Sequence, residues 1–266
     1  MTVLRKFIGI GRRQLAFEQV YRFNTFVWAI SVPLVFLINY FLWVSIFAAS
    51  GQTVIKGFTL NDMLVYYLLS FITTILVSSH IDRVIPKLVK KGTLIKHLTK
   101  PINFITYSII EDFWGNVFNI VILPPLLIEA YFLISSFSIT STNFVLYLIS
   151  LISAFLISVF YVFSFSMASF WVKEYVGIRV IRKGVANFLS GSILPLTFFP
   201  VAMQKAFFYL PFPYMLYVPI QVGLGKYTFN ETLYMIGLQL MWVLIFAIVA
   251  LFAWKKAQTK FMGVGV

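Results

Sequence analysis

The protein has 266 residues, of which 61% are hydrophobic and 11% are charged, whereas soluble domains have roughly 45 to 50% apolar and about 25% charged residues. This composition predicts an integral membrane protein in which spans and short loops use almost the whole length, which excludes a soluble catalytic domain of the usual size. The formal net charge is +13, but the Lys and Arg residues lie at the ends of apolar runs, which indicates membrane orientation and argues against nucleic-acid binding.

The first 23 residues combine basic and apolar side chains. The basic ones are Arg5, Lys6, Arg12, Arg13 and Arg22. This mixture predicts a helix that lies in the membrane interface and binds lipids, with cations toward anionic head groups and aromatic rings at the acyl boundary. A basic tail that only orients the first span is the alternative.

Two spans are predicted in the first third of the chain. Residues 26–49 contain no charged residue, and they exceed the roughly 20 residues that a transmembrane helix needs. Residues 63–79 form a second span near the lower limit of length. The polar stretch 50–62 forms the short loop between these two spans.

The connection 80–101 is rich in cations: Arg83, Lys87, Lys90, Lys91, Lys96 and Lys100. Such an excess predicts that the connection faces the cytoplasm. Gly92 interrupts the pattern, and Leu94, Ile95 and Leu98 have an apolar spacing that is typical of a short helix lying against another element. We therefore expect a docking surface here, with simple anchoring by positive charge as the alternative.

A third span is predicted over residues 117–137, after an amphipathic approach that contains Glu111 and Asp112. Pro124 and Pro125 predict a kink in it. Glu129 lies inside this apolar run, where an ionisable side chain is costly unless it is paired, protonated or in contact with water. It is either a proton or cation site or a residue close to the outer interface, and we prefer the second interpretation because a polar turn follows.

The remaining spans are predicted over residues 144–171, 185–200 and 232–254. Prolines interrupt the apolar region around the second of them: Pro195, Pro200, Pro211, Pro213 and Pro219. Proline removes a backbone donor and clashes with the preceding turn, and lipid cannot satisfy the freed carbonyl groups. We expect residues 201–225 to form a broken, re-entrant segment that protein covers or that lines a water-filled pathway.

Basic residues concentrate in the N-terminal segment, in 80–101, in 172–183 and after residue 254, whereas the connections between these regions hold few. This alternation predicts an all-α polytopic membrane protein with six transmembrane helices and both termini in the cytoplasm. We expect residues 1–266 to form a single transmembrane domain.

Motifs for catalysis are missing from the sequence. The nearest approach to a nucleotide-binding P-loop, Gly225-Lys226-Tyr227, lacks the upstream glycine and the small hydroxyl residue that phosphate and magnesium require. The chain has no cysteine and only two histidines, His80 and His97, which lack the spacing of a metal site. We therefore expect no catalytic residue, no metal and no cofactor.

Two blocks of sequence resemble the type-2 permeases of ATP-binding-cassette (ABC) exporters. The connection reads KKGTLIKHLTKP, which is similar to the family's G-x-L and L-x-K-P pattern. The block SGSILPLTFFPVAMQKAFFYLPFPYMLYVPIQVGLGK is similar to the family's segment from span five into the re-entrant region. With the basic interfacial helix and six spans, the resemblance covers nearly the whole chain.

The resemblance implies a half-transporter in the cell membrane. Two permease chains, identical or related, would associate with two separate cytoplasmic ATP-binding subunits. In such transporters the N-terminal helix and the first cytosolic loop contact the ATPase, so the candidate coupling residues are Arg12, Arg13, Lys90, Lys91, Gly92 and Leu94. The proline-rich re-entrant segment would line or cap the outer end of the pathway.

Two other functions compete with this one. An ion-coupled secondary transporter also uses broken helices, and Glu129 could carry its protons, but the sequence has no inverted repeat. A membrane-embedded enzyme is the second competitor, and it lacks a recognisable nucleophile or metal motif.

Overall fold

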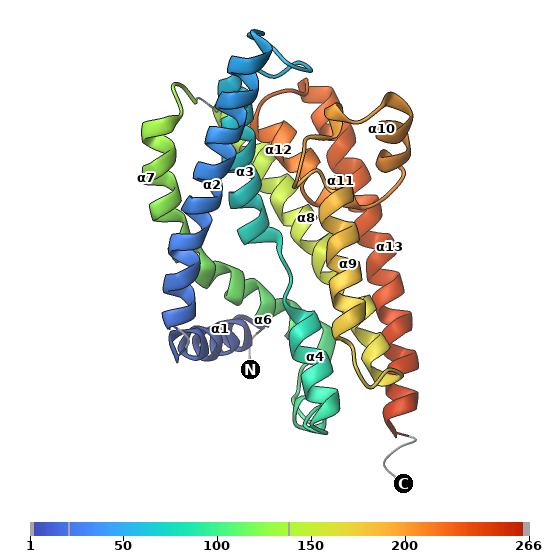
Figure 1. The fold of residues 1–266 in the computed structure, drawn as a ribbon. Coiled ribbons are helices and arrows are strands. Elements are labelled where there is room, and N and C mark those ends of the chain that lie inside the picture. Colours follow the sequence, from blue (N-terminus) through green and yellow to red (C-terminus); the bar gives the residue numbers. More distant parts are fainter. Residues whose placement is uncertain (1–2, 21, 138, 263–266) are drawn as a thin grey trace.

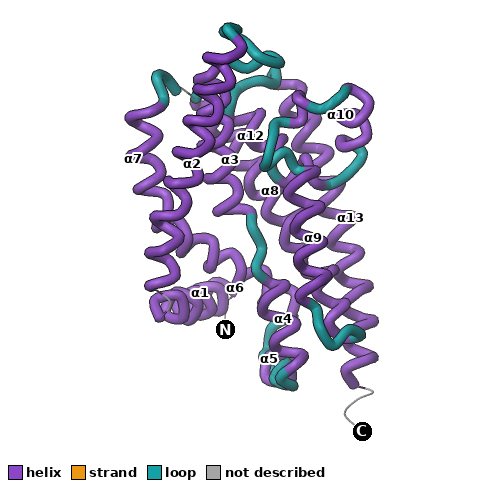
Figure 2. Tube along the Cα trace, viewed as in Figure 1, coloured by secondary structure: helices purple, strands orange, loops and turns teal. Residues whose placement is uncertain are grey.

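The computed structural model describes residues 3–20, 22–137 and 139–262, which form helices joined by short loops (Figures 1 and 2). In chain order the helices are α1 (Val3–Val20), α2 (Arg22–Ser50), α3 (Leu60–Val77), α4 (Ile81–Lys90), α5 (Ile95–Leu98), α6 (Phe104–Asn119), α7 (Leu123–Leu133), α8 (Ser141–Ser166), α9 (Val176–Leu189), α10 (Val201–Phe208), α11 (Phe212–Met215), α12 (Tyr217–Gly223) and α13 (Phe229–Met262). Short 3-10 turns lie at Ile120–Ile122, Met167–Phe170 and Leu196–Phe198.

Five helices of the described chain are long and apolar enough to cross a membrane. They are Thr25–Ser50 in α2, Leu60–Lys90 in α3 and α4, Phe104–Leu133 in α6 and α7, Ser141–Phe170 around α8, and Phe229–Phe261 in α13. The protein is therefore a polytopic all-α membrane protein, which confirms the fold class. Helix α1, helices α4 and α5, and the C-terminal part of α13 all lie at one end of the molecule, here called the inner end (Figures 1 and 2).

The N-terminal segment forms the expected helix. Helix α1 runs across the inner end, crosswise to α2 (Figure 1), and packs against α6. The ring of Phe7 lies 5.4 Å from that of Trp114, and the Trp114 ring leaves no room for a Cβ at Gly11. Close packing of ring against glycine thus fixes α1 to the bundle.

The third predicted span is kinked, as expected, but it begins earlier than residue 117. Helix α6 starts at Phe104 and ends at Asn119, a 3-10 turn follows, and α7 begins at Leu123. Pro124 and Pro125 occupy the first turn of α7, where a missing N–H group breaks no helical hydrogen bond. The amphipathic approach and the apolar run are thus two halves of one bent span.

The fifth predicted span, 185–200, differs in the structure. Helix α9 begins at Val176, ends at Leu189 and has 14 residues, fewer than the roughly 20 that a spanning helix needs. The chain then turns at Gly191, whose φ is +83°, and reaches Pro195, which supplies no N–H donor. A continuous helix over 185–200 is therefore wrong, and a sixth crossing stays a prediction.

Side chains of other elements satisfy the irregular backbone after α9. The hydroxyl of Tyr66 donates to the carbonyl of Gly191 at 2.6 Å, and that of Tyr67 donates to the carbonyl of Ile193 at 2.9 Å. The amide of Gln204 donates to the carbonyls of Thr197 and Phe199. These bonds satisfy backbone carbonyl groups that have no helical partner and that lipid could not satisfy.

The segment that carries the remaining prolines is covered by protein. Residues 211–223 are all buried, and α12 packs against α3 and α8. Pro211 precedes α11, while Pro213 and Pro219 lie in the first turns of α11 and α12, positions whose N–H groups have no helical partner. The expected protein cover is thus present, and re-entry from the outer side stays a prediction.

Helix α8 lies at the centre of the bundle, where it packs against α3, α4, α11, α12 and α13. Within the most apolar window of each span, 61% of the α8 residues are buried but only 17% of the α13 residues. The two helices are joined by Gln239, which accepts from Ser150 Oγ at 3.0 Å and donates to the Tyr214 carbonyl at 2.8 Å. Gln239 thereby satisfies the backbone at the break between α11 and α12.

We predict that Gln239→Leu destabilises the fold by about 1 to 3 kcal/mol, because it leaves the buried Tyr214 carbonyl without a donor. Thermal unfolding in detergent, followed by the fluorescence of the six tryptophans, measures the loss. Gln52→Leu, at an exposed loop position, is the control and should unfold like the wild type. Equal behaviour of the two variants would contradict the role of Gln239.

Candidate functional site

A break in the second span separates α3 from α4. Helix α3 ends at Val77 and α4 begins at Ile81, and Ser78 has extended backbone angles. Two side chains of α6 satisfy the freed groups. Asn116 donates to the carbonyls of Leu76 at 3.0 Å and Ser78 at 2.8 Å, while Asp112 accepts from the His80 N–H at 2.9 Å. The break is therefore a built junction between the bundle and α4.

A buried ion pair joins α4 to α9 directly after this junction. Arg182 Nη2 lies 2.5 Å from Asp82 Oδ2, and the two side chains are only 7% and 5% exposed. The guanidinium of Arg182 also lies over the ring of Tyr161 on α8, 5.4 Å from its centroid. A buried charge without a partner is costly. Separating α4 from α9 would leave both Asp82 and Arg182 in that state, so the ion pair holds the two helices together.

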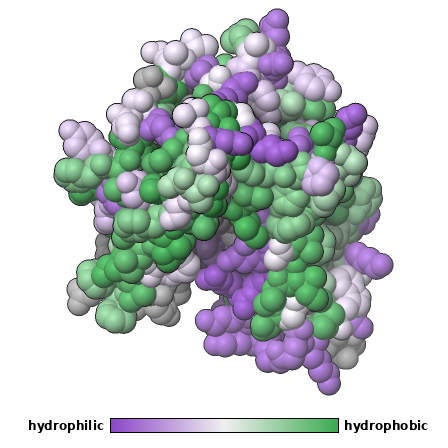
Figure 3. All heavy atoms as spheres, turned by 45° about the horizontal axis from the view of Figure 1, so that its top comes forward, coloured by the Kyte–Doolittle hydropathy of each residue, from purple (hydrophilic) through white to green (hydrophobic). Residues whose placement is uncertain are grey.

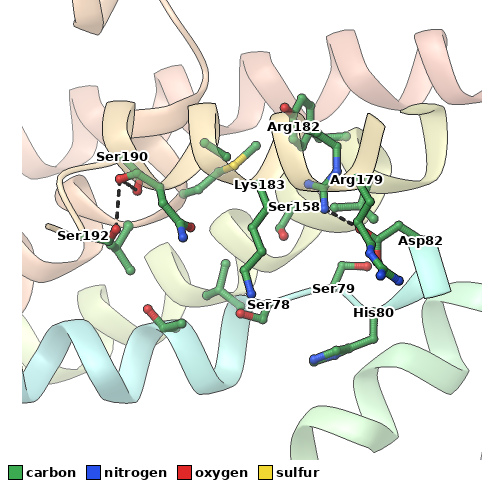
Figure 4. A pocket seen from close by; sticks show the side chains of 18 of the residues that line it. Ser78, Ser79, His80, Asp82, Ser158, Arg179, Arg182, Lys183, Ser190 and Ser192 are labelled. Atoms are coloured by element: carbon green, nitrogen blue, oxygen red, sulfur yellow. Dashed lines mark hydrogen bonds and ion pairs between the residues drawn. The ribbon is translucent and has the colours of Figure 1, made fainter. Parts of the chain in front are cut away.

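A cavity of about 310 Å³ lies beside the ion pair, between the α3–α4 junction, α8 and α9. Figure 4 shows Lys183 reaching from α9 toward Ser78, and Arg179 extending from the same helix toward the α3–α4 junction. The lining also includes Ser158, Asn187 and Met215, among others. The cavity thus combines basic and hydroxyl side chains with an apolar lining.

Beyond the ion pair, α4 forms an arm at the inner end. It stops at Lys90, the chain turns at Gly92 with a φ of +67°, and α5 follows as the predicted short helix. Lys90, Lys91 and Gly92 are exposed, and Lys90 pairs with Glu174 at 2.6 Å. In the view of Figure 3, hydrophilic side chains gather on the lower part of the molecule, between apolar surfaces.

Leu94 differs from the other candidate residues of this connection because it is fully buried. It packs in the same core cluster as Ile81 and Ile85 of α4. Its side chain therefore holds the arm in place and presents no surface to a partner. The exposed apolar residue in this part of the arm is Ile95, at 55% exposure.

Helix α1 is fastened to the other end of the same connection. Lys6 Nζ donates to the carbonyl of Pro101 at 2.6 Å, and Arg13 pairs with Glu111 at 2.8 Å. Arg13 and Lys100 both lie over the Tyr107 ring, at 5.3 and 4.1 Å from its centroid. The predicted N-terminal and loop regions thus meet at Lys100 and Pro101, while Arg12 stays exposed.

Electrostatics at this contact favour a neutral histidine. Burial lowers the pKa of His97, and the neighbouring Lys100 lowers it further. Burial also lowers the pKa of Lys100, with a contribution from Arg13. A neutral imidazole can accept a bond from Lys100 Nζ, which lies 3.4 Å from His97 Nδ1. His97 therefore helps to position Lys100 over the Tyr107 ring.

Glu129 lies in α7, four residues before the helix ends at Leu133. Its side chain is half-buried, and its Oε2 atom has no hydrogen-bond partner among the described residues. The position near the end of α7 agrees with the interface interpretation. The choice between that interpretation and an ion site stays open to experiment.

Sequence reasoning missed the residues that hold the junction. Asp112 was expected only as part of an amphipathic approach, Arg182 only as an inner positive charge, and neither Asp82 nor Asn116 was singled out. The available signal was polar side chains inside or beside apolar runs, which are costly there unless they are paired. Their partners lie 32 to 100 residues away along the chain, and spacing alone gives no such pairing.

Comparison with known proteins gives one family. The family described as ABC-2 family transporter protein has a model that matches residues 34–265. Searches of curated proteins and of solved structures find no match.

We predict that Asp82→Asn destabilises the protein by about 3 to 5 kcal/mol, because it leaves the Arg182 charge buried without a partner. The double variant Asp82→Asn, Arg182→Met should recover much of the loss, since it removes both charges. Thermal unfolding in detergent compares the variants.

The matched control for this test is Lys90→Met, which breaks the exposed pair with Glu174, where the side chains are 68% and 71% exposed. Exposed pairs contribute at most about 1 kcal/mol. If Asp82→Asn were as mild as Lys90→Met, the buried pair would not hold α4 to α9.

Proposed function

The chain belongs to the ABC-2 family of transporter proteins, and we propose that it is the permease subunit of an ABC exporter. It would form the substrate pathway as a dimer, with an identical or related second permease, and be driven by separate cytoplasmic ATP-binding subunits. The observation that carries this proposal is the exposed basic arm that a buried ion pair connects to the bundle. The arm is the part of the chain best suited to receive a mechanical input from another subunit.

The inner end would face the cytoplasm of the cell membrane. The α4–α5 arm and the end of α13 lie there (Figure 1), and they hold exposed cations, among them Lys87, Lys96 and Lys255. An excess of Lys and Arg favours the cytoplasmic side. Both termini would then lie in the cytoplasm.

The proposed ATPase contact is the exposed turn of the arm. Lys90 and Lys91 would supply charge, Gly92 would allow the left-handed turn between them and α5, and Ile95 would add apolar contact. Arg12 on α1 is exposed and would extend the contact, whereas Arg13 is already engaged with Glu111. Leu94 would act from inside, as the anchor of the arm.

Motion would pass from the arm into the bundle along two connections. The Asp82–Arg182 pair joins α4 to α9, and the bonds of Asp112 and Asn116 join the α3–α4 junction to α6. When ATP closes the ATPase dimer, α4 and α9 would move together as a rigid body. Because α4 also packs against α8, opening of the pathway would require α4 and α9 to shift together against α8.

Two further elements have proposed places in this scheme. Helix α1 would lie in the cytoplasmic interface, where Arg5 is exposed and would meet anionic lipid. The buried α11–α12 segment, with the carbonyl of Tyr214 held by Gln239, would cap the outer end of the pathway.

We predict that Lys90→Glu combined with Lys91→Glu loses the ATPase partner. The tagged wild-type chain, purified from the cells it comes from, should bring with it a subunit that hydrolyses Mg-ATP. Charge reversal at the turn should reduce the retained hydrolysis several-fold, because the contact would become repulsive.

The control reverses the charges of Lys255 and Lys256, which are also exposed at the inner end, and it should retain the partner. Equal retention by both double variants would contradict the docking turn. If no ATP hydrolysis accompanied the wild type, the exporter proposal would fail, and an ion-coupled transporter that uses Glu129 would take its place.

A further inference from the structure

The cavity beside the ion pair carries an excess of positive charge. Among the described residues that line it, Asp82 is the acidic one, and its carboxylate already pairs with Arg182. The remaining charged lining residues are Arg83, Arg179 and Lys183. In the described chain no carboxylate lies within ion-pair distance of any of these three. The cavity therefore holds about three positive charges that its own lining does not neutralise.

Helix α9 directs these cations to one place. Arg179, Arg182 and Lys183 are three and four residues apart, so they share one face of the helix, and Ala186, Asn187 and Ser190 continue the same stripe along the cavity. Figure 4 shows Lys183 and Arg179 extending from α9 toward the α3–α4 junction. Lys183 is exposed and Arg179 is partly exposed, so this stripe connects the cavity with the surface.

A buried donor inside the cavity is also unused. Arg182 is 9% exposed, and its Nε atom is buried without a hydrogen-bond partner among the described residues. An unpaired donor on a buried charged group is costly, and an acceptor supplied by a ligand would remove that cost. Hydroxyl groups of Ser78 and Ser158 line the same space and can donate to oxygen.

We propose that this cavity binds a phosphate group of a ligand that enters from the inner end. A phosphate ester carries one to two negative charges and several acceptor oxygens, which match the cations and hydroxyl groups of the lining. Arg groups bind phosphate through two parallel bonds, and Lys binds it as a point charge. A volume of about 310 Å³ accommodates a head group of this kind.

The inference deepens the proposed function, on which its meaning for transport rests. The cavity lies between α9 and the junction of α4, the two elements that would move together. A ligand that neutralises Arg83, Arg179 and Lys183 would therefore bind at the place where the ATPase input arrives. Two sources supply such a group, a phospholipid head group and a free phosphorylated solute.

The site is tested by measuring how the purified full chain binds phosphate-containing probes, without an ATPase or a transport assay. The outcome therefore does not depend on whether the exporter proposal is correct. The first arm titrates inorganic pyrophosphate against the protein in neutral detergent and follows the unfolding temperature, with sodium chloride at equal ionic strength as reference. The second arm adds phosphatidylglycerol or phosphatidylcholine and counts retained lipids by native mass spectrometry.

The test variant is Arg179→Gln with Lys183→Gln, which keeps the buried pair of Arg182 intact. The control is Lys255→Gln with Lys256→Gln, which removes the same charge from exposed positions at the inner end. We expect the test variant to bind at least about tenfold more weakly in one arm, since a tenfold change corresponds to about 1.4 kcal/mol, the scale of one charge-assisted hydrogen bond. The control should bind like the wild type.

The two arms identify the source of the phosphate. Loss of phosphatidylglycerol alone from the test variant assigns the site to a lipid head group, and loss of the pyrophosphate response assigns it to a free solute. If the test and control variants bind both probes equally, or if the wild type binds neither, the proposal is overturned.

Discussion

Each break in a helix frees backbone N–H and C=O groups that lipid cannot satisfy, and this constraint organises the structure. Asn116 and Asp112 serve the break between α3 and α4. Tyr66 and Tyr67 serve the irregular chain after α9. Gln239 performs the same task between α11 and α12. The breaks are therefore fixed connections, because the groups that satisfy them come from other helices and are themselves buried.

The break between α3 and α4 is the one that faces the basic arm. An arm attached through an unsupported coil would move freely and transmit no force to the bundle. Here the coil is bonded to α6, and the first turn of α4 is bonded to α9 by Asp82 and Arg182. In the proposed mechanism, a push on the exposed turn would pass through this ion pair to α9. The basic cavity lies beside this ion pair, between the α3–α4 junction, α8 and α9.

Hydropathy predicted much of the fold, because a bilayer requires helices that are long and apolar. The positions of four long spans, the kink near Pro124, and the short helix Ile95–Leu98 follow from apolar length, proline chemistry and spacing. The predicted fifth span failed because hydropathy does not register the turn at Gly191, where the Tyr66 hydroxyl replaces a helical bond. The burial of Leu94 was not predictable for a related reason: a leucine among exposed lysines has the pattern of a contact residue, and its burial is visible only in the folded chain. The ion pair joins residues 100 positions apart and required the structure.

The account depends on α4 and α9 moving as one body. Because the chain has no cysteine, spin labels can be placed at Lys87→Cys and Val180→Cys, both exposed positions, in the complex with its ATPase. The mean distance between the labels should be the same in the nucleotide-free and ATP-bound states. The distribution of distances should become broader when Asp82→Asn is added. A shift between the two states larger than the spread of the labels, in the protein that keeps Asp82, would contradict the account.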